Sequence, residues 1–203
     1  HVSNLLGDVV DVPALTERVH AAGARVVVDG VAYAPHRRID CTGWDVDWYV
    51  YSTYQVFGPH MAALYGRADA VAELTGPNHF FIAKDDVPYK FELGGASHEG
   101  CAGLLALERY LAHLIEVDFD APLTDRQLDR AFDLVTALEI EPTRRLIDFL
   151  RSKDTVRIVG PDHAEVSRVG TVSFVHAERP SREIVEVVDR SPIAIRHGHM
   201  YAY

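Results

Sequence analysis

Three consecutive valines at 26–28 end at an aspartate, Asp29, and directly follow a segment with helical periodicity. β-Branched residues favour strands, and an uninterrupted apolar run is typical of a strand buried on both faces, as in a parallel sheet. In the preceding segment, residues 11–24, Pro13 stands where a first helical turn tolerates proline, and Gly23 stands where a helix ends. An amphipathic helix followed at once by a buried strand predicts an α/β fold.

The remaining segments continue this alternation and then become mainly helical. Further strands are predicted at 45–52, 61–66, 155–159 and 170–176. Helices are predicted at 67–74, 99–114, 125–139, 143–152 and 181–189. An interruption is expected near Pro142, because proline lacks the N–H that a helix interior needs. We expect two domains, namely part of an α/β large domain at 1–116 and a smaller, truncated α+β domain at 117–203.

The composition limits the kinds of partner. The chain has 203 residues, 48% of them hydrophobic, and a formal net charge of -10. Such a chain can bury a core, whereas nucleic acids and anionic membranes attract basic surfaces. No apolar run reaches the roughly 20 residues of a membrane span, and no secretion signal is recognisable. We therefore expect a cytoplasmic protein that binds small molecules and other proteins, but neither nucleic acid nor membrane.

The two cysteines, Cys41 and Cys101, have neither the spacing of a disulfide framework nor that of a zinc site. We expect both to be reduced thiols. Because Cys101 begins an apolar helix, a buried and unreactive thiol is predicted there.

Polar residues follow two of the predicted strands at the point where each strand ends. Asp29 ends the first strand, and Ser52, Tyr54 and Gln55 come at the end of the second. In open α/β sheets, ligands bind outside the carboxyl ends of the strands, so these side chains are predicted to share one site. A partly buried carboxylate needs a cationic partner, for which a protonated pyridine nitrogen is one candidate. The alternative for Asp29 is a carboxylate that caps a helix or a turn.

A phosphate group would suit the same strand end. Ser52 and Thr53 offer hydroxyl groups, and the turn around Gly58 allows a ligand to approach the backbone closely. The sequence therefore predicts a ligand with a phosphate at this site.

The stretches HVSNLLGDVV, GARVVVDGVAYAPH, YVYSTYQVFGPHMAALYGR, FELGGASHEG and IAIRHGHMYAY follow one another along the chain. Together they resemble the class V aminotransferase family, in its cysteine-desulfurase-like branch, whose members have the PLP-dependent transferase fold type I. The resemblance implies an incomplete chain, because the family's sequences extend beyond it at both ends. It also implies an enzyme that uses pyridoxal 5'-phosphate (PLP) and acts on an amino acid through an aldimine with this cofactor.

The resemblance assigns roles to residues of the predicted site. Asn4 matches the asparagine near the cofactor's phenolic oxygen, and Asp29 matches the aspartate that pairs with the pyridinium nitrogen. Ser52 matches the phosphate-binding serine, while Tyr54 occupies the position of a phosphate-contacting histidine. A phenol can still donate that hydrogen bond. Gln55 occupies the position of the catalytic lysine that forms a Schiff base with the cofactor.

The glutamine at position 55 changes the expected activity, because an amide nitrogen is neither nucleophilic nor basic. The only lysines are Lys84, Lys90 and Lys153, and the first two are predicted to be solvated surface charges. We therefore expect a transferase or lyase of this family whose catalysis is impaired. A noncatalytic relative that binds PLP, or that acts through its dimer surface, is the alternative.

Other landmarks of the family lie further along the chain. Gly94 and Gly95 match a loop that contributes a phosphate contact to the neighbouring subunit, which implies a homodimer. His36 and Arg196 are placed at the substrate site or its entrance. Tyr201 or a neighbour stands where true cysteine desulfurases carry a persulfide-forming cysteine, so the resemblance disfavours persulfide chemistry.

Five histidines raise the question of a metal site. They are His36, His60, His98, His197 and His199. They lack a carboxylate-bearing signature such as HExxH. We therefore expect no bound metal, and an unrelated α/β metalloprotein remains a third alternative.

Overall fold

The computed structural model of the protein describes residues 1–77, 79–92 and 94–201. These residues form two compact units. One contains residues 11–132, and the other combines residues 1–10 with the residues from 133 onward. The predicted domain boundary after residue 116 stays a prediction for the complete protein.

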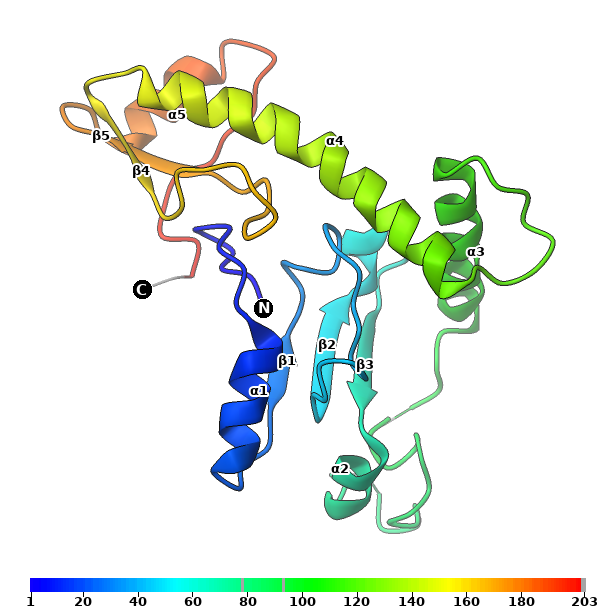
Figure 1. The fold of residues 1–203 in the computed structure, drawn as a ribbon. Helices are drawn as coiled ribbons and strands as arrows, with labels where there is room; N and C mark the ends of the chain where they lie inside the picture. Colours follow the sequence, from blue (N-terminus) through cyan, green and yellow to red (C-terminus); the bar gives the residue numbers. More distant parts are fainter. Residues whose placement is uncertain (78, 93, 202–203) are drawn as a thin grey trace. The chain divides into compact units, whose positions relative to one another are not determined.

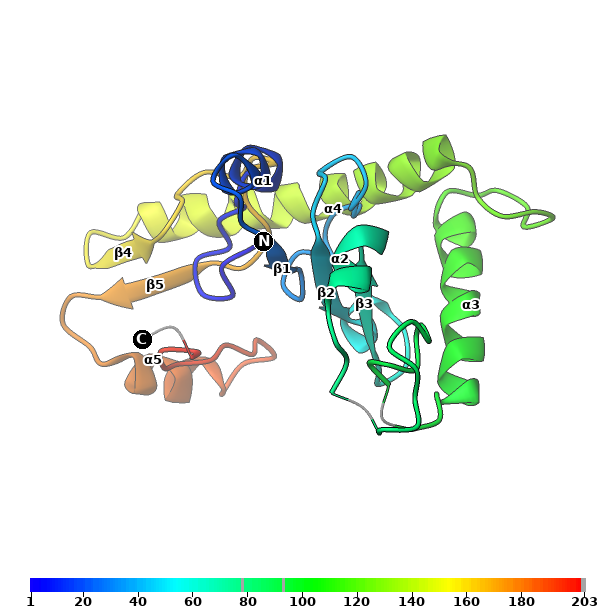
Figure 2. The same cartoon turned by 90° about the horizontal axis from the view of Figure 1, so that it is seen from below.

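The unit formed by residues 11–132 is built on a three-stranded sheet with the order β1-β2-β3. Its strands are β1 (Val27–Asp29), β2 (Trp48–Ser52) and β3 (Ala62–Gly66). The first two strands are parallel, with Asp29 opposite Val50, and β3 runs antiparallel to β2, with Ala62 opposite Ser52. Both views show the three strands side by side (Figures 1 and 2). Three strands predicted from the sequence are therefore confirmed.

Helix α1 (Val12–Ala21) covers one face of this sheet. Asp11 caps its first turn by accepting a 3.0 Å hydrogen bond from the Ala14 N–H, and Gly23 follows its end with a φ of 74°. The core between the helix and the sheet consists of Val12 of α1 and of Val26, Val28, Val46 and Tyr49. The helix and both of its predicted ends are confirmed.

Burial of β1 differs from the prediction. The side chain of Val28 is 5% exposed, but that of Val27 is 70% exposed. Successive side chains of a strand point to opposite faces, and only the face that carries Val28 packs against the core around Val12. The prediction of burial on both faces is therefore wrong for the residues described.

The other helices of this unit are α2 (Ala68–Glu73) and α3 (His98–Leu114). The long helix α4 (Asp125–Arg151) begins in this unit and ends in the other. Leu111 and Ile115, at the end of α3, pack with Ala131 of α4 in a second apolar cluster.

The predicted interruption near Pro142 is wrong, because α4 continues through this residue. A proline inside a helix removes one backbone hydrogen bond. The other hydrogen bonds and the packing of this 27-residue helix compensate for that loss. The next residue, Thr143, donates its hydroxyl to the carbonyl of Glu139 at 2.8 Å.

The second unit contains the antiparallel pair β4 (Val156–Val159) and β5 (Ser173–His176), followed by α5 (Ser181–Val188). The predicted strands and helix of this region are confirmed. The N-terminal segment belongs to the same unit, since the Val9 N–H donates to the Ser167 carbonyl at 3.0 Å and the Val169 N–H to the Gly7 carbonyl at 2.9 Å.

A buried arginine organises this junction. Arg168 is 2% exposed, and its guanidinium donates to the backbone carbonyls of Pro161, Val169 and Thr171. Burial lowers the pKa of Arg168 from its ordinary value, although the charge of Glu139 acts in the opposite direction. The guanidinium therefore fastens the loop that holds the N-terminal segment.

Candidate functional site

The parallel pairing of β1 and β2 places Asp29 and Ser52 at the same edge of the sheet. Each residue ends its strand, and the Gly30 N–H continues the pairing by donating to the Val50 carbonyl at 2.8 Å. The prediction that two strand ends converge is confirmed by this register. Their roles toward a ligand stay predictions.

The carboxylate of Asp29 is oriented by a turn. Its Oδ1 accepts a 2.9 Å hydrogen bond from the Val31 N–H, and the residue is exposed. This contact matches the alternative role of a turn aspartate. A carboxylate has two oxygens with several acceptor positions, so the turn leaves the group able to meet a cationic partner as well.

Gly30 allows the chain to turn directly after Asp29. A Cβ atom at this position would lie 2.1 Å from the ring of Tyr49, which is buried in the core beneath the sheet. Burial raises the pKa of the Tyr49 phenol above its ordinary value, with the charge of Asp29 among the smaller causes. The bend after β1 thus depends on a glycine that packs against a buried aromatic ring.

A short 3₁₀ helix, η1 (Thr53–Val56), follows β2 and begins a tight turn that ends at Met61. The hydroxyl of Thr53 donates to the Pro59 carbonyl at 2.6 Å, and the Thr53 N–H donates to the Met61 carbonyl at 2.9 Å. The Gly58 N–H donates in return to the Thr53 carbonyl at 2.9 Å. Because Thr53 is completely buried, the prediction that its hydroxyl binds phosphate is wrong.

This turn presents Tyr54 and Gln55 at the surface. Tyr54 is 50% exposed, and its ring is stacked on the ring of His60, with 5.0 Å between centroids and 20° between planes. Gln55 is exposed in the same turn, directly before the buried Val56. The expected phosphate contact and the expected lysine position are therefore neighbours on a turn held from beneath by Thr53.

Three other predicted site residues of this unit lie in irregular segments. His36 is partly buried in the turn that follows β1. Gly94 and Gly95 precede α3 and are exposed, and a Cβ atom at either would meet no atom of the described residues within 4 Å. Their open surroundings leave the backbone accessible to a ligand or to another subunit.

Asn4 and Arg196 belong to the unit that contains both ends of the chain. The Nδ2 group of Asn4 donates to the Met200 carbonyl at 2.7 Å. Arg196 is exposed in a segment without regular secondary structure. Asn4 is thus linked to the same terminal segment that carries Arg196 and Tyr201.

One of the lysines is placed differently from the prediction. Lys84 is exposed, as expected, but Lys90 is only 3% exposed. The ammonium group of Lys90 donates to the carbonyls of Val71 and Leu74 at 2.6 and 3.0 Å, at the C-terminal end of α2. The last carbonyls of a helix lack partners within it, so a lysine there is stabilising. The interpretation of Lys90 as a solvated surface charge is therefore wrong.

The two cysteines differ in their exposure to solvent. Burial, assisted by the charge of Asp40, raises the pKa of Cys41 to about 11, which suits an unreactive thiol. Cys101 is exposed, so its predicted burial is wrong. The buried position in this turn of α3 is Gly100. Cys101 is the next residue, and its side chain is therefore rotated by about 100° around the helix axis, away from the buried face.

A buried ionic network at the opposite end of the sheet was not foreseen from the sequence. Asp47, completely buried, accepts hydrogen bonds from the Val26 N–H at 2.7 Å and from His20 Nε2 and Arg25 at 2.8 Å. Arg67 lies 2.8 Å from the same carboxylate. Burial by itself raises the pKa of Asp47, but these donors hold it below its ordinary value. The signal available was an aspartate in a predicted strand beside two arginines at strand ends.

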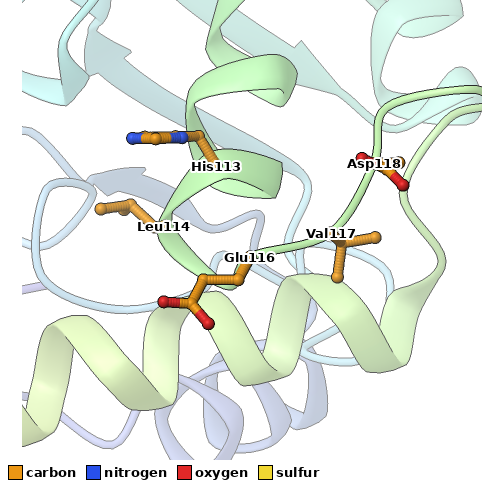
Figure 3. A pocket seen from close by; sticks show the side chains of 5 residues that line it. All are labelled: His113, Leu114, Glu116, Val117 and Asp118. Carbon is orange, nitrogen blue, oxygen red and sulfur yellow. The ribbon is translucent and has the colours of Figure 1, made fainter.

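A surface hollow lies at the C-terminal end of α3 (Figure 3). Its lining consists of His113, Leu114, Glu116, Val117 and Asp118. These residues are distinct from those that the sequence analysis assigns to the site.

Among the described residues, no group of three or more histidine, cysteine or acidic side chains is arranged to hold a metal ion. The helices of the described part also include none long and apolar enough to cross a membrane.

Comparison with known proteins gives one consistent result. The family model described as Aminotransferase class-V matches residues 1–203. An aminotransferase-like protein of Gibberella zeae is 35% identical over 205 residues, which is 100% of this chain and 48% of that protein. A cysteine desulfurase-like protein of Aspergillus flavus is 32% identical over 203 residues, which is 98% of this chain and 43% of that protein.

A solved structure agrees with these sequence similarities. The apo structure of a cysteine desulfurase from Thermococcus onnurineus superposes with a TM-score of 0.72 at 25% identity, over 98% of this chain and 48% of that one. The chain thus spans about half the length of the proteins that it matches.

Proposed function

Since this chain belongs to the class V aminotransferase family, we propose that the whole protein is a PLP-dependent enzyme acting on an amino acid, with its catalysis impaired by Gln55. The family and the α/β fold expected from the sequence are confirmed by the family match and by the desulfurase structure. Members of this family use pyridoxal phosphate. The reaction, the substrate and the role of Gln55 are the proposed part.

The residues at the sheet edge fit this cofactor. Asp29, oriented by the Val31 N–H, offers a carboxylate to the pyridinium nitrogen. Ser52 ends the neighbouring parallel strand, and Tyr54 follows in the exposed turn, so two hydroxyl donors suit the phosphate group. When bound, PLP withdraws electrons from the substrate's α-carbon. The proposed work of Asp29 is to keep the ring nitrogen protonated.

Asn4 and the glycine loop complete the proposal. Asn4 would orient the cofactor's phenolic oxygen through its side-chain amide, which in this structure donates to the Met200 carbonyl. Gly94 and Gly95 would offer backbone N–H groups to a phosphate. Arg196 and His36 would line the path of the amino acid. These assignments rest on the family resemblance.

Gln55 limits what the site does. A side-chain amide neither attacks an aldehyde nor accepts a proton from the α-carbon, so it leaves the cofactor without a covalent anchor. A positioned proton carrier contributes typically about 10²–10⁴-fold to rate. The observation that carries the proposal is the place of Gln55, exposed in the turn after Ser52 and next to Tyr54.

The experiment uses the full-length protein and its Gln55→Lys variant. Each is incubated with PLP, treated with borohydride, and analysed by mass spectrometry for cofactor fixed to the chain. We expect fixation at residue 55 in the lysine variant alone. Gln55→Met, which is of similar size and lacks an amine, is the matched control. Fixation of the cofactor by the unchanged protein at another lysine would contradict the impairment, and failure of Gln55→Lys to bind PLP would contradict the cofactor site.

A noncatalytic role is the second candidate, and Gln55 itself is the observation that favours it. In that case, Gln55→Lys fixes PLP but turns over no amino acid from a panel assayed for desulfuration, elimination, epimerisation and amino transfer. Turnover by the lysine variant would instead identify a disabled enzyme.

We also propose that the complete protein is a cytoplasmic homodimer. The dimer is supported by the resemblance and by the open surroundings of Gly94 and Gly95. Analytical ultracentrifugation of the full-length protein tests it, and a monomer would contradict it. Fractionation of cells tests the location.

A further inference from the structure

Tyr54 and His60 form a stacked aromatic pair on the exposed turn after β2. Their ring centroids are 5.0 Å apart and their planes differ by 20°. His60 is exposed and Tyr54 is 50% exposed, so neither ring is held by a surrounding core. The stacking therefore restrains the orientation of each ring.

The backbone fixes His60 in place. Thr53, which is completely buried, donates its hydroxyl to the carbonyl of Pro59 and its N–H to the carbonyl of Met61, the two residues that flank His60. The Met61 N–H also donates to the Pro59 carbonyl at 2.8 Å. The buried threonine thus sets the position from which His60 meets Tyr54.

We propose that His60 is a positioning residue for the cofactor's phosphate, which acts by holding the ring of Tyr54 in the plane where its hydroxyl reaches that group. This inference rests on the proposed function. A half-exposed tyrosine loses rotational freedom when it binds a ligand, and a ring that is already stacked has lost part of it beforehand. The flat face of His60 is what the role requires, rather than its ring nitrogens.

The size of the effect follows from the strength of aromatic pairs. Such pairs contribute an amount that corresponds to about a 2–10-fold change in affinity. The effect is confined to ligands that carry a phosphate, because the hydroxyl of Tyr54 acts on that group alone. PLP and pyridoxal, which lacks the phosphate, are therefore the two probes.

Affinities of the full-length protein for PLP and for pyridoxal are measured by equilibrium titration of absorbance. His60→Gln keeps a polar group and removes the ring, whereas His60→Phe keeps the ring and removes the nitrogens. We expect His60→Gln to weaken PLP binding about 2–10-fold and to leave pyridoxal binding unchanged. We expect His60→Phe to retain the affinity of the unchanged protein. In a Tyr54→Phe background, His60→Gln should have no further effect.

Other outcomes overturn the inference. An equal loss of PLP and pyridoxal affinity in His60→Gln means that His60 only supports the fold of the turn. Loss in His60→Phe with retention in His60→Gln means that a ring nitrogen contacts the ligand directly. An undiminished effect of His60→Gln in the Tyr54→Phe background removes Tyr54 from the mechanism. If the unchanged protein binds no PLP, both the proposed function and this inference are wrong. If it binds PLP and His60→Gln leaves the affinity for PLP unchanged, only this inference is wrong.

Discussion

Asp47 Oδ2 lies 2.8 Å from His20 Nε2, and this contact joins the last turn of α1 to the residue that precedes β2. The same buried carboxylate accepts from the N–H of Val26, the residue that precedes β1. Three elements therefore depend on one side chain.

Replacing this carboxylate should destabilise the unit formed by residues 11–132. Asp47→Ala leaves the buried Val26 N–H without its acceptor, which costs about 1–3 kcal/mol, and it removes one of the carboxylates that pair with Arg25 and Arg67. Urea unfolding of the full-length protein, followed by tryptophan fluorescence, measures the loss. Asp47→Asn should cost less, because an amide oxygen can still accept from Val26. Equal losses in the two variants would contradict this explanation.

The same residue predicts the acid limb of the stability curve. The donors around Asp47 hold its pKa in the folded state below the ordinary value of about 3.9. Above that value the carboxylate is charged in both states and the stabilisation is complete. As the pH falls below it, the unfolded state takes up the proton first, so stability declines until the pH passes the lower folded-state pKa. The free energy of unfolding is measured by urea titration at a series of pH values from about pH 6 downward. It should decline less steeply with falling pH in Asp47→Asn than in the unchanged protein. Parallel curves for the two proteins would show that other carboxylates dominate.

Gly30→Ala should destabilise the sheet edge that carries Asp29. The added methyl group would lie 2.1 Å from the Tyr49 ring, so either the ring or the strand end must move. Overpacking of this kind typically costs about 1–3 kcal/mol. Gly94→Ala is the matched control, because its Cβ atom would meet none of the described residues within 4 Å. Thermal unfolding compares the two variants, and a similar melting temperature for both would refute the role of Gly30.

Thr53→Val should loosen the turn that presents Tyr54 and Gln55. The substitution keeps the shape of the side chain but removes the hydroxyl that donates to the Pro59 carbonyl at 2.6 Å. Because this carbonyl keeps the Met61 N–H as a donor, the loss is that of one hydrogen bond, about 0.5–1.5 kcal/mol. Hydrogen exchange at the Gly58 amide, which donates to the Thr53 carbonyl, reports on the turn directly. Exchange should accelerate in Thr53→Val and stay near its original rate in Thr53→Ser. Unchanged protection in the valine variant would mean that the hydroxyl contributes little.

Arg168→Met should weaken the other unit. Methionine fills much of the same volume, but the carbonyls of Pro161, Val169 and Thr171 lose their donor, and an unsatisfied buried acceptor costs about 1–3 kcal/mol. Limited proteolysis should cut the segment around residue 168 faster in this variant. Arg182→Met is the control, since Arg182 lies on the exposed surface of α5. Equal rates of cleavage in the two variants would argue against the clamp.

The strands and helices could be predicted because their signals are local. The valine run, Pro13 and Gly23 each act within a few residues, and the structure places β1 and α1 where these signals indicate. The convergence of Asp29 and Ser52 followed from a general rule for parallel strands.

Two of the errors concern surroundings that distant segments provide. Exposure of Val27 depends on which faces of the sheet are covered, and burial of Lys90 depends on the carbonyls at the end of α2. Neither partner is visible in the neighbouring sequence. The same holds for Thr53, whose position at a strand end suggested a ligand, while its hydroxyl bonds a carbonyl across the turn. Residue type therefore predicted which strand ends converge, but it did not predict that the Thr53 hydroxyl is bonded within the turn.

The hydrogen bond between Asn4 and the Met200 carbonyl has a consequence for when contacts can form during translation. Residues 11–132 form their unit from one continuous stretch, so the contacts within this unit join residues that are translated in one run. Residues 1–10 are translated before this unit and yet pair with residues 167–169 and 200, which are translated after it. Residues 1–10 therefore lack these partners until translation has passed residue 200.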